Sequence, residues 1–337
     1  MTTTTQISQR TIGYIAKKLL ERAQPLLILD RFGQAKPIPK HHTRTIKFRG
    51  YNHLANQPKP LMEGITPASS QPTFRDIEAT LGQYGDWVEL TDVLADTHED
   101  PLIAEFTDIL GSQAAVMRER ITLGVLLAGT NVYFSGVTAG VPATARTGVN
   151  EPITLNLQRR ILRGLKRQLA TPHTSFVSAS PNFSTSPIPP SFIAICHTDC
   201  EADIRNIPGF VPTEKYGSYS PLPGEIGSVE GVRYLATTVA EAWPDAGDAT
   251  TTMVSTTGAC ADVYPVLYLG KSAYGIVPFA SSGKGSRPVT PAVLNPNIPR
   301  GGDPLGQRGS IGWKMMHTAI ILYDFWMARA EVAVSIV

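Results

Sequence analysis

Two cysteines and a histidine lie within five residues of one another, in the string CHTDC at 196–200. Thiolates and imidazoles are the ligand types that zinc prefers. A zinc site needs four converging ligands, and no second Cys/His group stands at a suitable spacing. Because neighbours in a strand point to opposite faces, we interpret Cys196 as a buried thiol and His197 as a surface imidazole.

Three strings rich in glycine and serine have the composition of loops that bind phosphate or hold a catalytic serine. GKS at 270–272 ends like a phosphate-binding loop, but Pro265 occupies the position of that motif's first glycine. SSGKGS at 281–286 also lacks the spacing, and GKSAYG at 270–275 is one residue too long for a nucleophile elbow. The sequence therefore indicates no catalytic, cofactor or metal site. An intracellular hydrolase using Cys196, Cys200 or a serine is the weakest alternative.

The charges are segregated along the first third of the chain. Residues 1–60 carry eleven lysines and arginines against two carboxylates, a balance of +9. Residues 61–110 carry eleven carboxylates against Arg75, a balance of −10, although the whole chain has a net charge of only +2. Opposite charges on neighbouring copies attract and help to set register. The pattern predicts self-association, and the total charge is too small for a dedicated nucleic-acid binder.

The composition predicts a soluble, folded protein of a cytoplasmic setting. With 337 residues, 42% of them hydrophobic, the chain can bury a sizeable core as one elaborated domain or two subdomains. Three cysteines are too few for a disulfide framework and suit a reducing compartment. The first residues lack the apolar region of a signal peptide, and charges interrupt the apolar stretch 318–337, so we expect no membrane segment.

The elements that must position these residues predict a mixed α+β fold. Alternating residues from Thr45 and again from Ile77 predict two strands, with a bulge or twist near Gly82 and Gly85. Four prolines between them predict a long projecting loop over 52–74, which we interpret as a binding element. The tryptophans in strand-like or amphipathic sequence are expected to anchor the core or an interface. These are Trp87, Trp313 and Trp326.

Two helices and several strands follow. Asp100 and Pro101 are a good helix start, and apolar residues at helical spacing predict a long helix over 101–128. A second helix is predicted over 155–170, with a basic face that we interpret as solvated. That face comprises Arg159, Arg160, Arg163, Lys166 and Arg167. Short strands are predicted at 192–197, 232–237, 263–269 and 275–279.

Five strings spread over most of the chain resemble the major capsid proteins of tailed bacteriophages, which have the Hong Kong 97 shell fold. They are most similar to the branch typified by the coat protein of phage N-four. The strings are LMEGITP (61–67), QYGDWVELTD (83–92), AGTNVYFSG (128–136), GEIGSVEG (224–231) and DPLGQRGSIGWK (303–314). Each is modest alone, but they occur in the family's order.

The resemblance implies a division of the chain into the segments of that fold. These are an N-terminal arm at 1–42, an extended β-hairpin loop at 43–90, a peripheral domain with the long spine helix at 91–130, an axial domain at 131–309, and a return to the peripheral domain at 310–337. In such shells the extended loop lies over an adjacent subunit. We therefore expect inter-subunit contacts from residues of the basic strand and the acidic loop, namely Arg44, Lys47, Arg49, Glu63, Asp76 and Glu78.

The resemblance also implies the partners. The chain would assemble with itself as hexamers and pentamers of an icosahedral shell, in the virion after assembly in the host cytoplasm. The shell would contact portal and packaged double-stranded DNA without sequence specificity. The arm is too short for a fused scaffolding segment, so a separate scaffolding protein, or none, is implied, and a decoration protein is left open. The principal alternative is a cellular encapsulin-type shell around a cargo enzyme.

Overall fold

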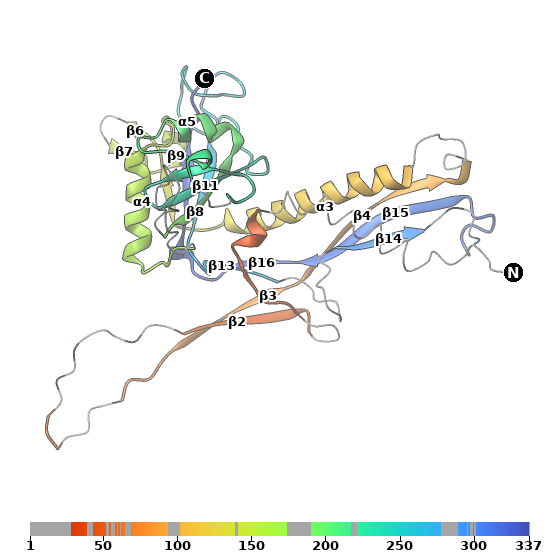
Figure 1. Ribbon diagram of the computed structural model, residues 1–337, viewed down its shortest axis with the longest axis horizontal. Coiled ribbons are helices and arrows are strands. Elements are labelled where there is room, and N and C mark those ends of the chain that lie inside the picture. The colour runs from red at the N-terminus through yellow and green to blue at the C-terminus, as the bar shows by residue number, and fades with distance from the viewer. Residues whose placement is uncertain are drawn as a thin grey trace.

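The computed structural model describes residues 28–38, 43–51, 54, 58, 60, 62–64, 69–93, 102–138, 141–173, 190–216, 221–277, 289–294, 296, 299 and 301–336. The molecule is elongated. A body built on a large sheet is joined by a long helix to a smaller sheet, and a β-hairpin projects from the region between them (Figure 1). The predicted mixture of strands with few helices is confirmed.

A seven-stranded mixed sheet forms the body, in the order β5-β17-β12-β8-β11-β10-β9. The pairs β11/β8 and β17/β5 are parallel and the others are antiparallel. The strands are β5 (Val132–Phe134), β8 (Phe192–His197), β9 (Val211–Pro212), β10 (Glu225–Val229), β11 (Val232–Thr237), β12 (Tyr264–Leu269) and β17 (Met327–Val332). The strands predicted at 192–197 and 232–237 are confirmed.

Both faces of this sheet are covered, which explains why its central strands β8, β11 and β12 are mainly apolar and buried along almost their whole length. One face packs against α4 (Leu155–Arg167) and α5 (Glu201–Arg205). Helix α4 begins where the Thr154 hydroxyl accepts a hydrogen bond from the Leu157 amide at 3.3 Å. The opposite face packs against the last turns of α3 (Leu102–Leu126) and the short helix η2 (Leu29–Arg31).

Helix α3 confirms the predicted long helix. Its 25 residues span about 37 Å at about 1.5 Å per residue, and its first half packs against a second sheet in the order β14-β15-β4. These strands are β14 (Thr290–Leu294), β15 (Arg308–His317) and β4 (Gly82–Thr91). The predicted start of the helix at Asp100 and Pro101 lies outside the described residues.

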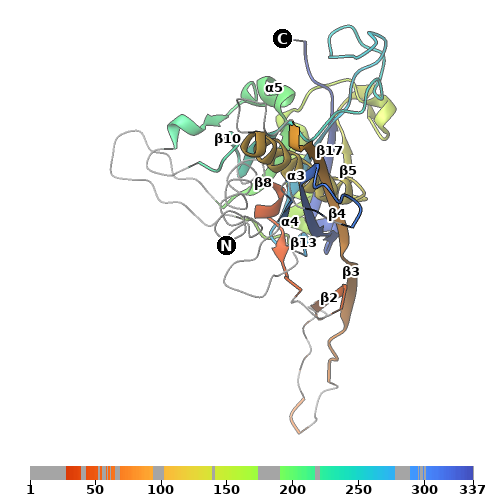
Figure 2. The same cartoon turned by 90° about the vertical axis from the view of Figure 1, so that its right-hand side faces the viewer.

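The projecting hairpin consists of β2 (Thr45–Tyr51) and β3 (Phe74–Thr80), paired antiparallel (Figures 1 and 2). Seen along α3, the hairpin points away from the helix and the body (Figure 2). Only Leu81 separates β3 from β4, and the chain there changes partner from β2 to β15. The predicted irregularity near Gly82 is thus a transfer between sheets, and residues 43–90 are divided between the hairpin and the sheet beneath α3.

A three-stranded sheet connects the hairpin to the body. It contains β1 (Gln34–Ala35), β13 (Tyr274–Ile276) and β16 (Ala319–Ile321) in the order β1-β13-β16. Gly275 is needed here, because a Cβ atom would lie 2.8 Å from the ring of Phe48 on β2. The remaining short elements are β6 (Val137–Thr138), β7 (Val141–Pro142), η3 (Arg146–Gly148), η4 (Thr198–Cys200), η5 (Thr213–Lys215) and η6 (Asp324–Trp326).

Candidate functional site

The reactive residues singled out by the sequence lie in the core of the body. Cys196 is fully buried, and its Sγ donates to the Leu235 carbonyl at 3.4 Å. Burial is the main cause that raises the pKa of this thiol to about 12, and it also raises the pKa of buried Cys200. The interpretation of Cys196 as a buried thiol is confirmed. Protonated, inaccessible thiols are unsuited to nucleophilic attack or metal binding.

His197 is bonded locally. Its Nδ1 lies 3.1 Å from Oδ2 of Asp199, whose other contact is the Tyr264 hydroxyl at 2.8 Å. In the part of the chain that the structure describes, no group of three His, Cys, Asp or Glu side chains is arranged to hold a metal ion. No described helix is both long and apolar enough to cross a bilayer.

The charged residues predicted to contact a neighbouring copy lie on the hairpin, where four of them form two cross-strand ion pairs. The register places Lys47 opposite Glu78 and Arg49 opposite Asp76. The Lys47 Nζ lies 2.6 Å from Oε1 of Glu78, and Arg49 donates to both carboxylate oxygens of Asp76 at 2.8 Å. These contacts raise the pKa of Lys47 and lower that of Asp76. This intramolecular pairing was not predicted, although the antiparallel register of the two strands could have indicated it.

The other two predicted contact residues lie apart from these pairs. Arg44 donates from Nη2 to the Leu81 carbonyl at 3.0 Å, and Leu81 in turn donates its amide to the Arg44 carbonyl at 2.9 Å. This reciprocal pair closes the base of the hairpin where β3 passes into β4. Glu63 is exposed, and it lies in a turn between β2 and β3. Most charged side chains on the hairpin are therefore neutralised within it. Its exposed apolar side chains are then the better candidates for contact with a neighbouring subunit.

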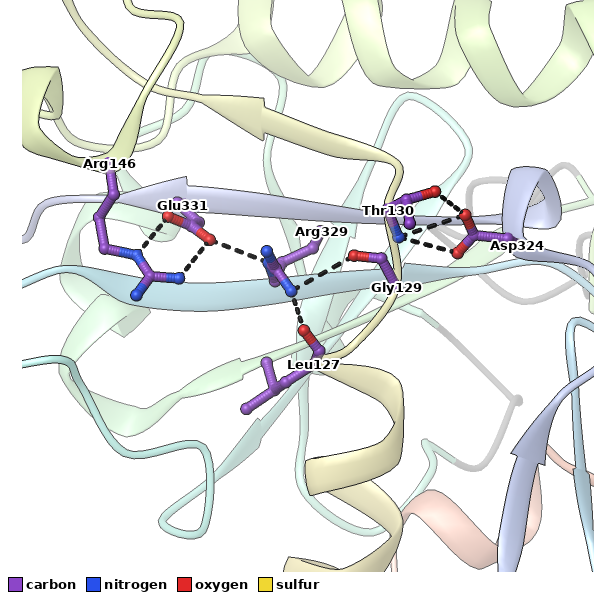
Figure 3. Close-up of polar contacts among 7 residues, drawn as sticks. All are labelled: Leu127, Gly129, Thr130, Arg146, Asp324, Arg329 and Glu331. Atoms are coloured by element: carbon purple, nitrogen blue, oxygen red, sulfur yellow. Dashed lines mark hydrogen bonds and ion pairs between the residues drawn. The ribbon is translucent and has the colours of Figure 1, made fainter.

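The C-terminal end of α3 is joined to the body by a buried ionic network (Figure 3). Glu331 on β17 accepts two hydrogen bonds from Arg146, at 2.7 and 2.8 Å, and lies 2.9 Å from Nε of Arg329. Arg329 then donates through Nη1 to the carbonyl of Leu127, just past the last turn of α3. The Arg329 guanidinium thus donates a hydrogen bond to a carbonyl for which the helix itself provides no donor.

Two further contacts fix the same joint. Asp324 accepts hydrogen bonds from the amide and hydroxyl of Thr130 (Figure 3). The Arg146 guanidinium lies 3.6 Å from the ring centroid of Trp243, in a cation–π contact. Segments far apart in the sequence thus hold the exit of α3 at one angle to the large sheet. The sequence signal available for this network was two opposite charges, Arg329 and Glu331, in an otherwise apolar strand.

Two buried carboxylates fasten η2 to the middle of α3. Glu119 accepts the Leu29 amide at 3.0 and 3.2 Å from its two carboxylate oxygens. Asp30 lies 2.5 Å from Nε of Arg118, and Tyr274 donates its hydroxyl to the Leu29 carbonyl. Burial is the main cause that raises the pKa of Glu119 to about 7, and the Asp30 carboxylate raises it further. Burial also raises the pKa of Asp30 against the opposing effect of Arg118.

This cluster predicts a stability that depends on pH. An acid whose pKa is higher in the folded than in the unfolded protein binds more protons when folded, so stability falls as the pH rises between the two values. For Glu119 the interval runs from its ordinary 4.5 to about 7. We expect Glu119→Gln to gain about 2–3 kcal/mol relative to the wild type between pH 5 and pH 8, at about 1.4 kcal/mol per pKa unit.

Urea unfolding of the unassembled protein at pH 5, 6, 7 and 8 measures this difference. His317, whose pKa burial lowers to about 3, titrates with the opposite slope below pH 6.5, but it is present in both proteins and cancels. The exposed Glu105 on the same helix provides the control, because Glu105→Gln should leave the pH profile unchanged. Parallel profiles for the wild type and Glu119→Gln would contradict the prediction.

The tryptophans and the basic helix face have different environments. Trp313 is buried beneath α3 and donates to Gln113 at 3.1 Å, as predicted for a core anchor. Trp87 is 62% exposed on β4, so it does not anchor the core.

On α4, Arg159 is paired with Glu230, while Arg163 lies exposed. The interpretation of that face as solvated fits its exposure.

Comparisons with known proteins agree with one another. The profile of a family described as "Phage capsid protein" matches residues 75–330. The capsid of Ralstonia phage GP4 is similar at 12% identity and a TM-score of 0.64, covering 90% of this chain and 88% of the other. The cyanophage Pam1 capsid asymmetric unit is similar at 13% identity and a TM-score of 0.58, covering 88% and 86%.

An encapsulin has a similar fold. The holo-SrpI encapsulin complex from Synechococcus elongatus PCC 7942 is similar at 11% identity and a TM-score of 0.52, covering 99% of this chain and 93% of the other. No curated protein sequence matches the chain. At these identities the structures show a shared fold, and the family match extends over most of the chain.

Proposed function

The chain belongs to the phage capsid protein family, and from this premise we propose that it assembles as hexamers and pentamers into an icosahedral head shell around double-stranded DNA. It is a major capsid shell protein, and its family and structural neighbours point to a structural role and not to catalysis. The shell architecture is that of the Hong Kong 97 fold, shared by phage capsids and encapsulins.

The observation that carries the proposal is the projecting hairpin. An isolated two-stranded hairpin is at best marginally stable in water. Tyr51 and Phe74, which face each other at the outer end of the β2/β3 ladder, are 66% and 57% exposed. A neighbouring subunit that received the hairpin would bury these rings, at about 25 cal/mol per Å² of apolar surface. Association would therefore stabilise a hairpin whose aromatic rings are exposed to solvent in the single chain.

We assign the segments of the shell fold accordingly. Residues 1–42 are the arm, 43–90 the extended loop, which ends in β4, and 91–130 the peripheral region with α3 as spine helix. Residues 131–309 are assigned to the axial domain and 310–337 to the return. The pairing of β15 with β4 supports a return into the peripheral sheet. The same pairing indicates that the last part of the extended loop belongs structurally to the peripheral sheet.

The remaining partners follow from assembly. We propose a portal at one vertex, a separate scaffolding protein or none, and DNA held without sequence specificity. The mature protein is then located in the virion, after assembly in the host cytoplasm.

Electron microscopy of the purified protein at two salt concentrations, beside light scattering for mass, tests the proposal. Closed icosahedral particles or rings of capsomer size are the expected result. A stable monomer or dimer that remains unchanged when scaffolding and portal proteins are added would contradict it.

A charge exchange within the hairpin tests the proposed inter-subunit role of its charged residues. Reversing only Lys47 and Arg49 would place like charges opposite Glu78 and Asp76 and split the ladder. The exchange K47E/E78K/R49D/D76R keeps both pairs but reverses their polarity. If a neighbouring subunit contacts these pairs, we expect a shell yield several-fold lower and a changed salt dependence, because the small contributions of exposed ion pairs are summed over many copies and are screened by salt. An unchanged yield and salt dependence would mean that these charges stabilise the hairpin and do not contact a neighbouring subunit.

The encapsulin-type shell is the second candidate, favoured by the fold shared with the SrpI complex. The two are separated by what the particles enclose and by the genes nearby. A neighbouring gene for a portal or a large terminase supports the phage shell, whereas a co-purifying cargo enzyme would support the cellular one.

A further inference from the structure

A cationic notch lies at the base of the hairpin. A cavity of about 220 Å³ is lined by Lys36, Arg49 and Arg75 together with apolar and aromatic side chains. The last group includes Phe48, Ile77, Leu322 and Tyr323. Three cations thus converge on a cavity whose walls are buried on one side, since Phe48 and Leu322 are each 5% exposed.

Neither Lys36 nor Arg75 forms an ion pair with a carboxylate within the part of the chain that the structure describes, although Asp76 interacts electrostatically with Lys36 at longer range. Lys36 donates from Nζ to the Lys47 carbonyl at 2.7 Å and lies 5.5 Å from the Phe48 ring. Arg75 donates to the Leu322 carbonyl and lies 5.4 Å from the Tyr323 ring. Arg49 is neutralised by Asp76. A backbone carbonyl and a ring face orient each head group but do not balance its charge, so the notch is built to receive an anion.

The chain itself has an excess of carboxylates at its other end. Between residues 76 and 117 there are ten carboxylates and no lysine or arginine. Asp76 and Glu78 are neutralised on the hairpin. At the far end of β4 and the start of α3, Glu89 and Glu105 are exposed and Asp92 is half-buried. Among the residues that the structure describes, Arg308 alone forms an ion pair with Glu89, at a distance of 3.8 Å.

These carboxylates cannot reach the notch of their own chain. Strand β4 runs from Gly82 at the base of the hairpin to Thr91, about 30 Å at about 3.4 Å per residue. The notch lies beyond Gly82 on the other side, against β2 and β3, and the two regions lie well apart along the molecule (Figure 1). The cations of the notch and these carboxylates can therefore contact one another only when they belong to two different copies of the chain.

We propose that the notch is an inter-subunit docking site that receives the acidic end of the peripheral sheet, formed by Glu89, Asp92 and Glu105, from a second copy of this chain. The inference rests on the proposed shell function and names a contact within it. Charge complementarity favours this occupant over DNA, because the same sequence supplies both halves and each copy carries one of each. Such a contact is heterologous, and it forms a closed ring where the rotation between successive subunits closes.

Charge reversal with compensation tests the contact. We expect K36E/R75E to lower the shell yield at least about ten-fold at 0.15 M salt, and K36E/R75E/E89K/E105K to restore it to within about three-fold of the wild type. The matched control is R163E/K166E on the exposed face of α4, which makes the same change in charge and should leave the yield within about two-fold. Circular dichroism establishes that each variant folds, and the neutral K36Q/R75Q variant should give an intermediate yield.

Carbodiimide coupling identifies the occupant directly in wild-type shells. The reagent activates a carboxylate, the Lys36 amine displaces the resulting urea, and an amide bond forms with the loss of one water to the reagent. Mass spectrometry should find Lys36 joined to Glu89, Asp92 or Glu105, in a product with the mass of two chains. Lys36 joined only to Asp76 or Glu78 of its own chain would overturn the proposal.

The remaining outcomes are equally decisive. K36E/R75E shells formed in wild-type yield contradict the notch contact but leave the shell function standing, whereas a wild type that never forms shells contradicts the shell function itself. If the reversed variant assembles normally but loses affinity for a 30-base-pair duplex in fluorescence anisotropy, the notch binds phosphate and the proposed occupant is wrong.

Discussion

Glu331→Gln should lower the free energy of unfolding by about 3–5 kcal/mol, the usual cost of removing one partner from a buried ion pair. Glu331 is fully buried and is the only carboxylate that the structure places against both Arg146 and Arg329 among the residues it describes. Glutamine keeps the volume but removes the charge, so two guanidinium groups remain in the joint with one neutral acceptor between them. Arg329 also bonds the carbonyl past the last turn of α3, and its reorientation would loosen the helix end.

Urea unfolding of the unassembled protein measures the loss. The matched control is Glu241→Gln, because Glu241 also pairs with an arginine, Arg120, but both side chains are more than half exposed. A solvent-exposed pair contributes about 0–1 kcal/mol, so this variant should differ little from the wild type. A loss below about 1 kcal/mol for Glu331→Gln would mean that the joint is held by packing and not by the ionic network.

The second large effect is expected at Arg233 and Glu225 in the body. Both side chains are fully buried, and Arg233 bonds the two carboxylate oxygens at 2.6 Å each. Glu225 also accepts the Tyr216 hydroxyl at 2.9 Å and the Leu222 amide at 2.8 Å. Arg233→Met leaves this carboxylate buried without its cation, so we expect a loss of about 3–5 kcal/mol.

A double-mutant cycle separates the pairing from the packing. The wild type, R233M, E225L and E225L/R233M form the cycle, and the coupling energy should be about 2 kcal/mol or more, because each single variant leaves one buried charge unpaired whereas the double variant removes both. The Tyr216 hydroxyl and the Leu222 amide lose their acceptor in both E225L variants, so that cost cancels in the coupling. The exposed pair Arg159/Glu230 gives the reference cycle, and its coupling should be much weaker because solvent screens an exposed ion pair. If both cycles give equal coupling, burial does not strengthen the Arg233 pair.

The parts of the fold that follow from local pattern could be predicted from the sequence. The strands at 192–197 and 232–237 and the long helix are confirmed because each depends on the apolar spacing of its own residues. The segregation of charge was also visible, but its consequence was only partly clear. The contact of Lys47 and Arg49 with another copy stays a prediction, and the structure adds that cross-strand neighbours neutralise both side chains within the hairpin.

The joints of α3 could not be predicted for a physical reason. Glu331 contacts a residue 185 positions away, and Glu119 contacts one 90 positions away. Their partners depend on how the large sheet, α3 and η2 pack together, and no local periodicity encodes that arrangement. What the sequence does indicate is the need for a partner, because a charge within an apolar strand or on the apolar face of a helix is costly when it is left alone.

Because the chain passes from β3 to β4 through Leu81 alone, a small change of angle there moves the outer end of the hairpin farther than its base. Its seven-residue strands are about 24 Å long at about 3.4 Å per residue, and they continue from β4 through a single buried residue. A rotation of about 10° at this pivot would move the outer end of the paired strands by about 4 Å, on the scale of one strand spacing. A change of angle at the base of the hairpin would therefore let subunits with identical packing meet neighbours across surfaces of different curvature.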